Sequence, residues 1–228
     1  MSTTTFTSLS ALRDEVCRVG HSLFQRGYVH ATAGNISVRV PEDLGGGFLI
    51  TPTDACLGDL SADALAWVEA DGQQICGDRA SKTLHLHRRI YAAVPAAQCV
   101  IHTHSTNLVA WSLRPRVTGQ EWIPPITPYF VMKVGRVPLI PYHRPGDPEV
   151  ALAVVKQVAQ AQAEGRDLHA VMLERLGPNV WGQSPAAAMA VLEELEETAK
   201  LCLMTQPLPA ALTERQIGEL RHHFSAPW

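Results

Sequence analysis

Two histidines, His102 and His104, close a short apolar run that reads Val100-Ile101-His102-Thr103-His104. Side chains along a β-strand alternate between its two faces, so both imidazoles are expected on the same face. Two imidazole nitrogens on one face can bind a single metal ion, and the apolar strand before them limits competing water ligands. A bare His-x-His pair also occurs as two ordinary histidines, so both readings stay open from this motif alone.

Two segments upstream of this pair carry groups suited to an anion. Gly34-Asn35-Ile36-Ser37 precedes a predicted strand, and Thr51-Pro52-Thr53-Asp54 follows the predicted partner strand. Backbone N–H groups and small hydroxyl or amide side chains at sharp turns can hold a phosphate or a carboxylate. The same residue types are also the usual ones in turns, which is the alternative for each segment.

A third anion-binding candidate is Ala80-Ser81-Lys82-Thr83, at the start of a predicted helix. The positive end of the helix dipole and the ammonium group of Lys82 both favour an anion there. Serine and threonine are also the usual residues at helix N-caps, so a plain cap with a solvated lysine is the alternative.

The elements that must position these residues alternate between helical and strand patterns. Helices are predicted, from three- and four-residue apolar spacing, over residues 10–26, 83–94, 106–113, 147–164, 185–204 and 213–223. Strands are predicted over residues 36–40, 48–51, 66–70, 74–76, 99–104, 136–140, 169–173 and 179–181. Residues 115–148 contain eight prolines and are predicted to be mostly loop. Two early hairpins favour antiparallel pairing, so we predict one α/β domain over residues 1–228, with a mixed, mainly antiparallel central sheet flanked by helices.

Composition narrows the class of protein. Hydrophobic residues make up 46% of the 228 residues and charged ones 18%, which excludes a disordered or collagen-like chain. The net charge of −3, without long runs of like charge, gives no nucleic-acid footprint. No apolar run is long enough to span a bilayer, and the five scattered cysteines favour a reducing compartment. We therefore expect a cytoplasmic protein with neither a nucleic-acid nor a membrane partner.

Taken in order, these segments resemble the class II aldolase/adducin family over roughly residues 9–203. The matching stretches are Gly34-Asn35-Ile36-Ser37, Thr51-Pro52-Thr53, Ser81 before a helix with His87 and Tyr91, and His102-Thr103-His104. Within this family, the subgroup that the segments resemble most is the 3-oxo-tetronate 4-phosphate decarboxylases. The stretches of this chain that resemble the subgroup are Gly77-Asp78, Ser81-Lys82, His104-Ser105-Thr106, Pro128-Tyr129-Phe130-Val131-Met132, and Pro141-Tyr142 with Pro145-Gly146-Asp147.

The resemblance implies a set of roles for individual residues. Substrate and phosphate binding is implied for Asn35, Ser37, Thr53, Asp54, Ser81 and Lys82. A divalent metal ion, with zinc expected before manganese or another ion, is implied at His102 and His104. Tyr129, from a neighbouring subunit, and Lys82 are implied as catalytic residues. The assembly implied is a homotetramer whose active sites lie between subunits.

Two positions depart from the family pattern. Thr83 stands where the family has a catalytic glutamate, and Leu176 stands where a third metal-binding histidine is expected. Leucine cannot bind a metal ion, whereas a catalytic zinc ion usually has three protein ligands. The third ligand is therefore unassigned. His143 and Glu174 are candidates, although spacing alone supports neither of them.

These residues favour one chemistry within the family. An aldolase must remove a proton to form its enediolate, whereas a β-keto acid forms it by losing carbon dioxide, so Thr83 counts more against aldolase activity. The sequence thus predicts decarboxylation of a phosphorylated 3-oxo sugar acid to dihydroxyacetone phosphate, with Tyr129 or water as proton donor. The alternative is a repurposed scaffold that acts on another acid with altered metal use, or that serves as a non-catalytic binding or oligomerisation subunit.

Overall fold

The computed structural model describes residues 8–115 and 120–228. Its strands form one sheet in the order β4-β3-β2-β1-β5-β8-β7-β6. Strands β6 and β7 run parallel, whereas β1–β2, β1–β5, β2–β3, β3–β4 and β7–β8 run antiparallel. The predicted α/β class with a mixed, mainly antiparallel sheet flanked by helices is confirmed.

The chain divides into two compact units, each made of two stretches of sequence. The first unit is Met1–His104 with Trp181–Met189, and the second is Ser105–Val180 with Ala190–Trp228. The prediction of a single domain over residues 1–228 stays a prediction.

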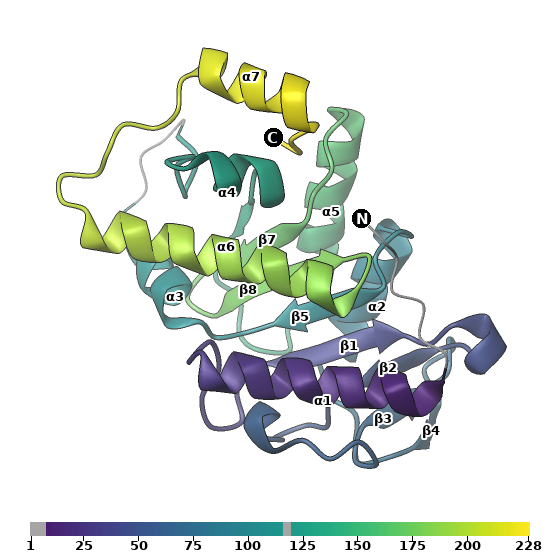
Figure 1. Cartoon of the computed structure of the whole chain (residues 1–228). Coiled ribbons are helices and arrows are strands. Elements are labelled where there is room, and N and C mark those ends of the chain that lie inside the picture. The colour runs from purple at the N-terminus through teal and green to yellow at the C-terminus, as the bar shows by residue number, and fades with distance from the viewer. Residues whose placement is uncertain (1–7, 116–119) are drawn as a thin grey trace. The chain divides into compact units, whose positions relative to one another are not determined.

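The first unit contains most of the predicted site residues. Its elements are α1 (Leu9–Gln25), β1 (Asn35–Arg39), η1 (Glu42–Leu44), β2 (Phe48–Ile50), η2 (Leu57–Asp59), β3 (Ala66–Val68), β4 (Gln74–Cys76), α2 (Leu84–Ala93) and β5 (Cys99–His102). The two short 3-10 helices, η1 and η2, were not predicted. Helix α1 lies alongside β1 (Figure 1).

The amphipathic pattern of α1 places its apolar residues in the core. Leu12, Val16, Val19 and Leu23 are buried, as their three- and four-residue spacing predicts. The hydroxyl of Ser8 accepts a hydrogen bond from the Ala11 amide at 3.1 Å and caps the first turn. Burial of one stripe and a capped start explain why this segment is helical.

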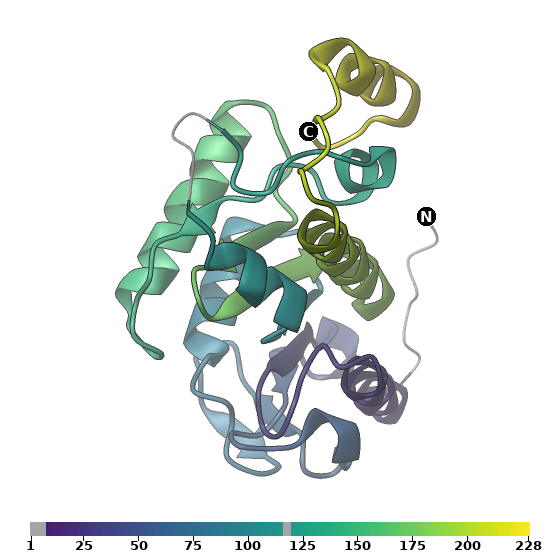
Figure 2. The same cartoon turned by 90° about the vertical axis from the view of Figure 1, so that its left-hand side faces the viewer.

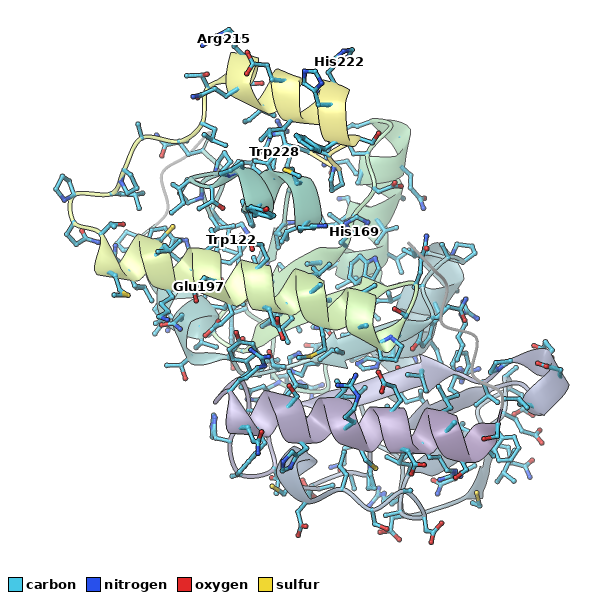
Figure 3. The ribbon with its side chains drawn as sticks, in the orientation of Figure 1. Trp122, His169, Glu197, Arg215, His222 and Trp228 are labelled. Carbon is cyan, nitrogen blue, oxygen red and sulfur yellow. The ribbon has the colours of Figure 1, made fainter. Side chains whose placement is uncertain are left out.

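The second unit is mainly helical. Its elements are α3 (Thr106–Ser112), α4 (Pro128–Lys133), β6 (Leu139–Ile140), α5 (Glu149–Ala163), β7 (Ala170–Leu173) and α7 (Glu214–Phe224). Strand β8 (Gly177–Gly182) and helix α6 (Pro185–Met204) have residues in both units. Helix α7 lies next to α4 in both views (Figures 1 and 2). The indole of Trp228 lies between these two helices and meets the Phe130 ring edge-on at 5.9 Å (Figure 3).

The described part of the proline-rich segment is mostly loop, as predicted, but it also contains helix α4, which was not predicted. Pro128 occupies the first turn, where a missing N–H costs no hydrogen bond. The hydroxyl of Thr127 accepts a hydrogen bond from the Phe130 amide at 3.2 Å and caps the helix. Helix α4 was not predicted because proline usually breaks a helix, whereas Pro128 lies in the first turn, where proline is tolerated. Residues 116–119 of the predicted loop lie outside the described residues.

Strands β7 and β8 form a hairpin around the position where a third metal-binding histidine was expected. Leu173 pairs with Gly177, so residues 174–176 form the connecting turn. Arg175 adopts a left-handed conformation with φ of 67°, and the Leu176 amide donates to the Leu173 carbonyl at 3.1 Å. Leu176 therefore lies in a tight hairpin turn of the second unit.

Candidate active site

The two predicted metal-binding histidines lie together at the end of β5. Their ring centroids are 5.0 Å apart. Two imidazoles that share one tetrahedral ion at the usual ligand distance of about 2.0–2.1 Å place their ring centroids about 5 Å apart. Burial lowers the pKa of His104, and the neighbouring His30 lowers it further, so this imidazole is held neutral with a lone pair available. The two side chains fit a divalent ion as two of its ligands.

No third protein ligand is in place. Among residues 8–115 and 120–228, no three histidine, cysteine, aspartate or glutamate side chains are arranged so that they could hold a metal ion. In the second unit, His143 Nδ1 lies 3.9 Å from Asp147 Oδ2, and a carboxylate oxygen of Glu174 accepts a hydrogen bond from the Tyr142 amide at 3.0 Å. The candidate roles of His143 and Glu174 stay predictions.

Asn35 stands opposite His102 across the β1–β5 ladder. Side chains directly opposite each other in an antiparallel pair project from the same face, with Cβ atoms about 4.5–5.5 Å apart. Asn35 is buried, and its Oδ1 atom has no hydrogen-bond partner among the described residues. A buried unpaired oxygen is costly, so a ligand donor or a metal ion beside His102 would stabilise it. Asn35 is thus well placed for the predicted site.

Ser37 lies deeper, in a buried chain of hydrogen bonds with His87 and Tyr91. The Tyr91 hydroxyl donates to the Ser37 carbonyl at 2.9 Å. Ser37 Oγ lies 2.9 Å from Tyr91 Oη and 2.7 Å from His87 Nδ1. The single tyrosine proton is used, so Ser37 must donate to Tyr91, and His87 Nδ1–H must donate to Ser37. The Ser37 hydroxyl is thus bonded inside the core, and the role of Ser37 in substrate and phosphate binding stays a prediction.

His87 is therefore a neutral imidazole whose Nε2 atom carries a lone pair. This Nε2 atom is buried and has no hydrogen-bond partner among the described residues. Burial, reinforced by the nearby His102, lowers the pKa of His87 to about 3. His87 is thus a fixed neutral support beneath the site.

We expect His87 to make the protein less stable in acid. The unfolded chain takes up a proton here near pH 6.5, and the folded chain does so only near pH 3. Lowering the pH below 6.5 should therefore reduce the free energy of unfolding through this group, with a slope that rises from about 0.7 kcal/mol per pH unit at pH 6.5 toward about 1.4 near pH 5. The free energy of unfolding can be measured by urea titration at several pH values with chelator present. In His87→Gln it should depend less steeply on pH, by the contribution of one proton. Equal slopes in the two proteins would contradict the assignment.

The two predicted anion-binding turns lie side by side. The Ser81 amide donates to the Thr51 carbonyl at 3.3 Å, and the Thr53 amide donates to the Arg79 carbonyl at 2.9 Å. These bonds bring Thr53 and Ser81 together but use their backbone donors. The roles of Thr53, Ser81 and Lys82 in anion binding stay predictions, and the groups left for such a contact are the two hydroxyls and the exposed Lys82 ammonium group. Asp54, also exposed, adopts a left-handed conformation with φ of 58°.

Thr83, predicted to stand in place of the family's catalytic glutamate, is hydrogen-bonded within the Ser81 turn. Thr83 Oγ1 lies 2.9 Å from Ser81 Oγ, and the Thr83 amide donates to the same serine oxygen at 3.4 Å. A threonine hydroxyl cannot act as a general base near neutral pH without a partner that removes its proton. The Thr83 side chain therefore does not supply a general base in this turn.

Gln74, which sequence reasoning missed, holds the loop that leads to Ser81. Its Nε2 atom donates to the carbonyls of Cys76, Gly77 and Asp78 at 3.3, 3.0 and 2.8 Å. Its Oε1 atom accepts a hydrogen bond from the Ala80 amide at 3.1 Å. One side chain thus holds the loop at four residues, Cys76, Gly77, Asp78 and Ala80, although no sequence motif identifies Gln74.

Gln74→Ala should raise the KM for a phosphorylated substrate about tenfold, because the Ser81 turn would no longer be held in its binding conformation. The change in kcat should be smaller, since the predicted place of the chemistry is at His102 and His104, away from this loop. Steady-state kinetics measure both constants. The matched control is Gln73→Ala, because only the backbone of this neighbouring glutamine makes hydrogen bonds. A KM equal to that of the control would contradict the role of Gln74.

Tyr129, the predicted proton donor, lies in α4 of the second unit. Tyr129 is 60% exposed. An exposed tyrosine of this kind is available to a neighbouring subunit, as the resemblance implies. The assignment of Tyr129 stays a prediction.

Comparisons with known proteins agree with the fold. The family model for the class II aldolase and adducin N-terminal domain matches residues 14–203. The 3-oxo-tetronate 4-phosphate decarboxylase of Cupriavidus necator is 51% identical over 224 residues, which cover 96% of this chain and 98% of that protein. The enzyme of the same name from Escherichia coli K12 is 42% identical over 92% of this chain and 95% of its own.

Solved structures give the same result. The structure of YgbL from Escherichia coli matches with a TM-score of 0.85 and 40% identity, over 93% of this chain and 99% of that one. An L-fuculose 1-phosphate aldolase matches with a TM-score of 0.79 at 21% identity, over 99% of this chain and 100% of that one, which shows the shared fold alone.

Proposed function

Because the chain belongs to the class II aldolase and adducin family, we propose that it is a carbon–carbon lyase that decarboxylates a 3-oxo-tetronate 4-phosphate or a close analogue. The products would be dihydroxyacetone phosphate and carbon dioxide. The proposal is supported by the 51% identity to a decarboxylase of this name over nearly the whole chain. Within the site, the observation that carries it is Thr83, because a decarboxylase does not require the base that is absent there.

The electron flow of this reaction explains why no base is needed. The bond between C1 and C2 breaks, carbon dioxide leaves, and the electron pair forms an enediolate across C2 and C3. A proton then adds to C2, and the ketone at C3 is restored. A divalent ion, when bound at His102 and His104, supplies electron withdrawal at the C3 carbonyl. The protein must otherwise hold the substrate and deliver one proton, for which Tyr129 or water is the proposed donor.

Binding of the substrate falls to the two joined turns. The Thr53 and Ser81 hydroxyls and the Lys82 ammonium group would contact the phosphate, with Asp54 at the edge of the pocket. Asn35, opposite His102, would contact the reacting end of the molecule. In this arrangement the turns would bind the phosphate, and the ends of strands β1 and β5 would hold the reacting end of the substrate.

Lys82→Ala should raise KM about tenfold and change kcat little, because Lys82 holds the anion equally in the ground state and the transition state. Steady-state kinetics with coupled detection of dihydroxyacetone phosphate measure both constants. An unchanged KM would show that Lys82 is a solvated lysine at a helix cap and does not bind the anion.

The proposed activity is tested with purified protein, 3-oxo-tetronate 4-phosphate and added zinc or manganese. The expected result is stoichiometric release of dihydroxyacetone phosphate and carbon dioxide that stops when the metal is chelated. Metal-loaded protein without turnover would refute the proposal. That result would favour the repurposed scaffold, which is motivated by the two departures at Thr83 and Leu176.

Three finer features belong to the same proposal. Zinc is the proposed ion, with manganese as the next candidate, and the assembly is proposed to be a homotetramer with active sites between subunits. Among the described residues, no helix is both long and apolar enough to cross a bilayer. We propose a cytoplasmic location. Metal analysis of the purified protein tests the identity of the ion, and light scattering tests the homotetramer.

A further inference from the structure

A surface cavity of about 500 Å³ lies within the second unit, and none of the proposed active-site residues lines it. Its walls come from the turn after α5, from α7 and from the residues that follow α7. Small-molecule sites in proteins usually measure about 300–1,000 Å³, so the cavity is large enough for a ligand. Its lining includes five polar or charged side chains, namely Arg166, Asp167, Arg221, His222 and Ser225.

One face of helix α7 forms a wall of this cavity. Gly218, Arg221 and His222 stand at positions i, i+3 and i+4, so they lie on the same side of the helix. Ser225, the C-cap residue, also lines the cavity. In Figure 3, His222 lies near the end of α7, and Trp228 lies between α7 and α4. The face that α7 turns toward the cavity is therefore polar.

Gly218 keeps space open beside these polar groups. Glycine inside a helix is destabilising relative to alanine. A Cβ atom at Gly218 would meet no heavy atom within 4 Å, so packing does not require a glycine at this position. The residue is thus unfavourable for the helix and unnecessary for packing, and what it does provide is room next to Arg221 and His222.

Two opposite charges in the lining have no partner. Arg221 and Asp167 make neither an ion pair nor a side-chain hydrogen bond with any residue in the described ranges 8–115 and 120–228. Arg166, in contrast, pairs with Glu164, an exposed carboxylate that does not line the cavity. The lining itself therefore carries two guanidinium groups and one carboxylate. A ligand with a single negative charge matches this balance better than a phosphate dianion does.

The hydrogen-bonding groups of the lining define the rest of the ligand. The Arg221 guanidinium can only donate, and it can bind a carboxylate through two parallel hydrogen bonds. The Asp167 carboxylate can only accept, so it requires a donor such as a hydroxyl group, whereas the Ser225 hydroxyl can do both. Trp228 adds an indole Nε1 that is buried and unpaired among the described residues, and an acceptor oxygen would stabilise it.

We propose that this cavity is a second binding site of the protein, for a small hydroxylated carboxylate of the sugar-acid type. The carboxylate binds to Arg221 and His222, the hydroxyl groups bind to Asp167 and Ser225, and Gly218 provides the space. The inference goes beyond the proposed function, because it concerns a ligand that takes no part in the reaction. An amino acid is the competing ligand, since an ammonium group would also suit Asp167.

Isothermal titration calorimetry with D-gluconate tests the proposal. The unmodified protein should bind gluconate at one site per chain, and Arg221→Gln should bind it at least tenfold more weakly, because a charged hydrogen-bonded pair is lost. Arg215→Gln is the matched control, because Arg215 is an exposed arginine at the start of α7 that pairs with Glu219 (Figure 3). Equal affinity in the two variants, or no binding to the unmodified protein, would overturn the proposal.

A second variant fills the cavity from the helix itself. Gly218→Leu should abolish gluconate binding, because its side chain would occupy the open space, while the thermal unfolding temperature should not fall. Gly218→Ala is the control for the loss of glycine, and it should keep most of the binding because it adds only a methyl group. Unchanged affinity in Gly218→Leu would also contradict the proposed site.

The same titrations separate this site from the proposed active site and test the class of ligand. Lys82→Ala should bind gluconate as tightly as the unmodified protein does. If Lys82→Ala loses binding while Arg221→Gln keeps it, gluconate occupies the proposed active site and the inference is wrong. Tighter binding of L-threonine or of inorganic phosphate than of gluconate at the Arg221 site would refute the sugar-acid assignment.

Discussion

Replacing His102 or His104 with alanine should remove the bound divalent ion and lower decarboxylase turnover at least a thousandfold, a loss of about 4 kcal/mol in transition-state stabilisation. The two rings provide the paired imidazoles of the site, with centroids 5.0 Å apart. Removing either ring leaves at most one of this pair. Metal content by elemental analysis and turnover by the coupled assay measure the two effects separately.

The fold should survive both changes, although the control must be chosen with care. His102 is buried, so alanine there leaves a small cavity in addition to the lost ligand. His102→Gln fills more of this space and serves as the second variant, while His85→Ala reports the effect of losing an exposed histidine. Thermal unfolding of the metal-free proteins should then differ little between His102→Gln and the control. Unchanged metal content in the His102→Ala or His104→Ala protein would show that the ligand assignment is wrong.

The sequence predicted well those features that depend on local spacing. Alternation along residues 99–104 placed His102 and His104 together, and the apolar spacing in residues 10–26 gave the buried stripe of α1. Both follow from strand and helix periods, which need no knowledge of the rest of the chain. Helix α4 was missed because the effect of a proline depends on whether it falls in the first turn or the interior of a helix.

Features that depend on tertiary contact could not be predicted in this way. Ser37 belongs to a turn that suits anion binding, yet strand pairing turns its hydroxyl toward His87 and Tyr91 in the core. Gln74 and His30 carry no motif at all. Their surroundings arise only when loops distant in the sequence pack together, so a list of turn residues cannot reveal them.

Glu196 is the buried residue that shows this limit most clearly. It is a carboxylate on α6 with only 3% of its surface exposed. One carboxylate oxygen accepts hydrogen bonds from the amide and the side-chain nitrogen of Asn107, both at 2.9 Å, and the other accepts from the Leu108 amide at 3.0 Å. Ser105, the N-cap residue of α3, makes no side-chain capping bond. A glutamate almost ninety residues away therefore caps this helix.

Glu196→Ala should lower the free energy of unfolding by about 3 kcal/mol, because it leaves two backbone N–H groups at the start of α3 without partners in a buried place. Glu196→Gln should lower the free energy of unfolding by less, because its amide oxygen can still accept hydrogen bonds. It should still be destabilising, because its NH2 group would face another hydrogen-bond donor. The matched control is Glu197→Ala. That neighbouring glutamate lies on the exposed side of α6 and pairs only loosely with Lys200, at 3.5 Å (Figure 3).

Urea unfolding of the three variants under the same conditions gives the comparison. The control should change stability by less than about 0.5 kcal/mol, as exposed ion pairs usually do. The expected order of destabilisation is Glu196→Ala, then Glu196→Gln, then Glu197→Ala. If Glu196→Ala costs no more than the control, the α3 amides must be satisfied without this carboxylate, and the cap would be a contact of little energetic value.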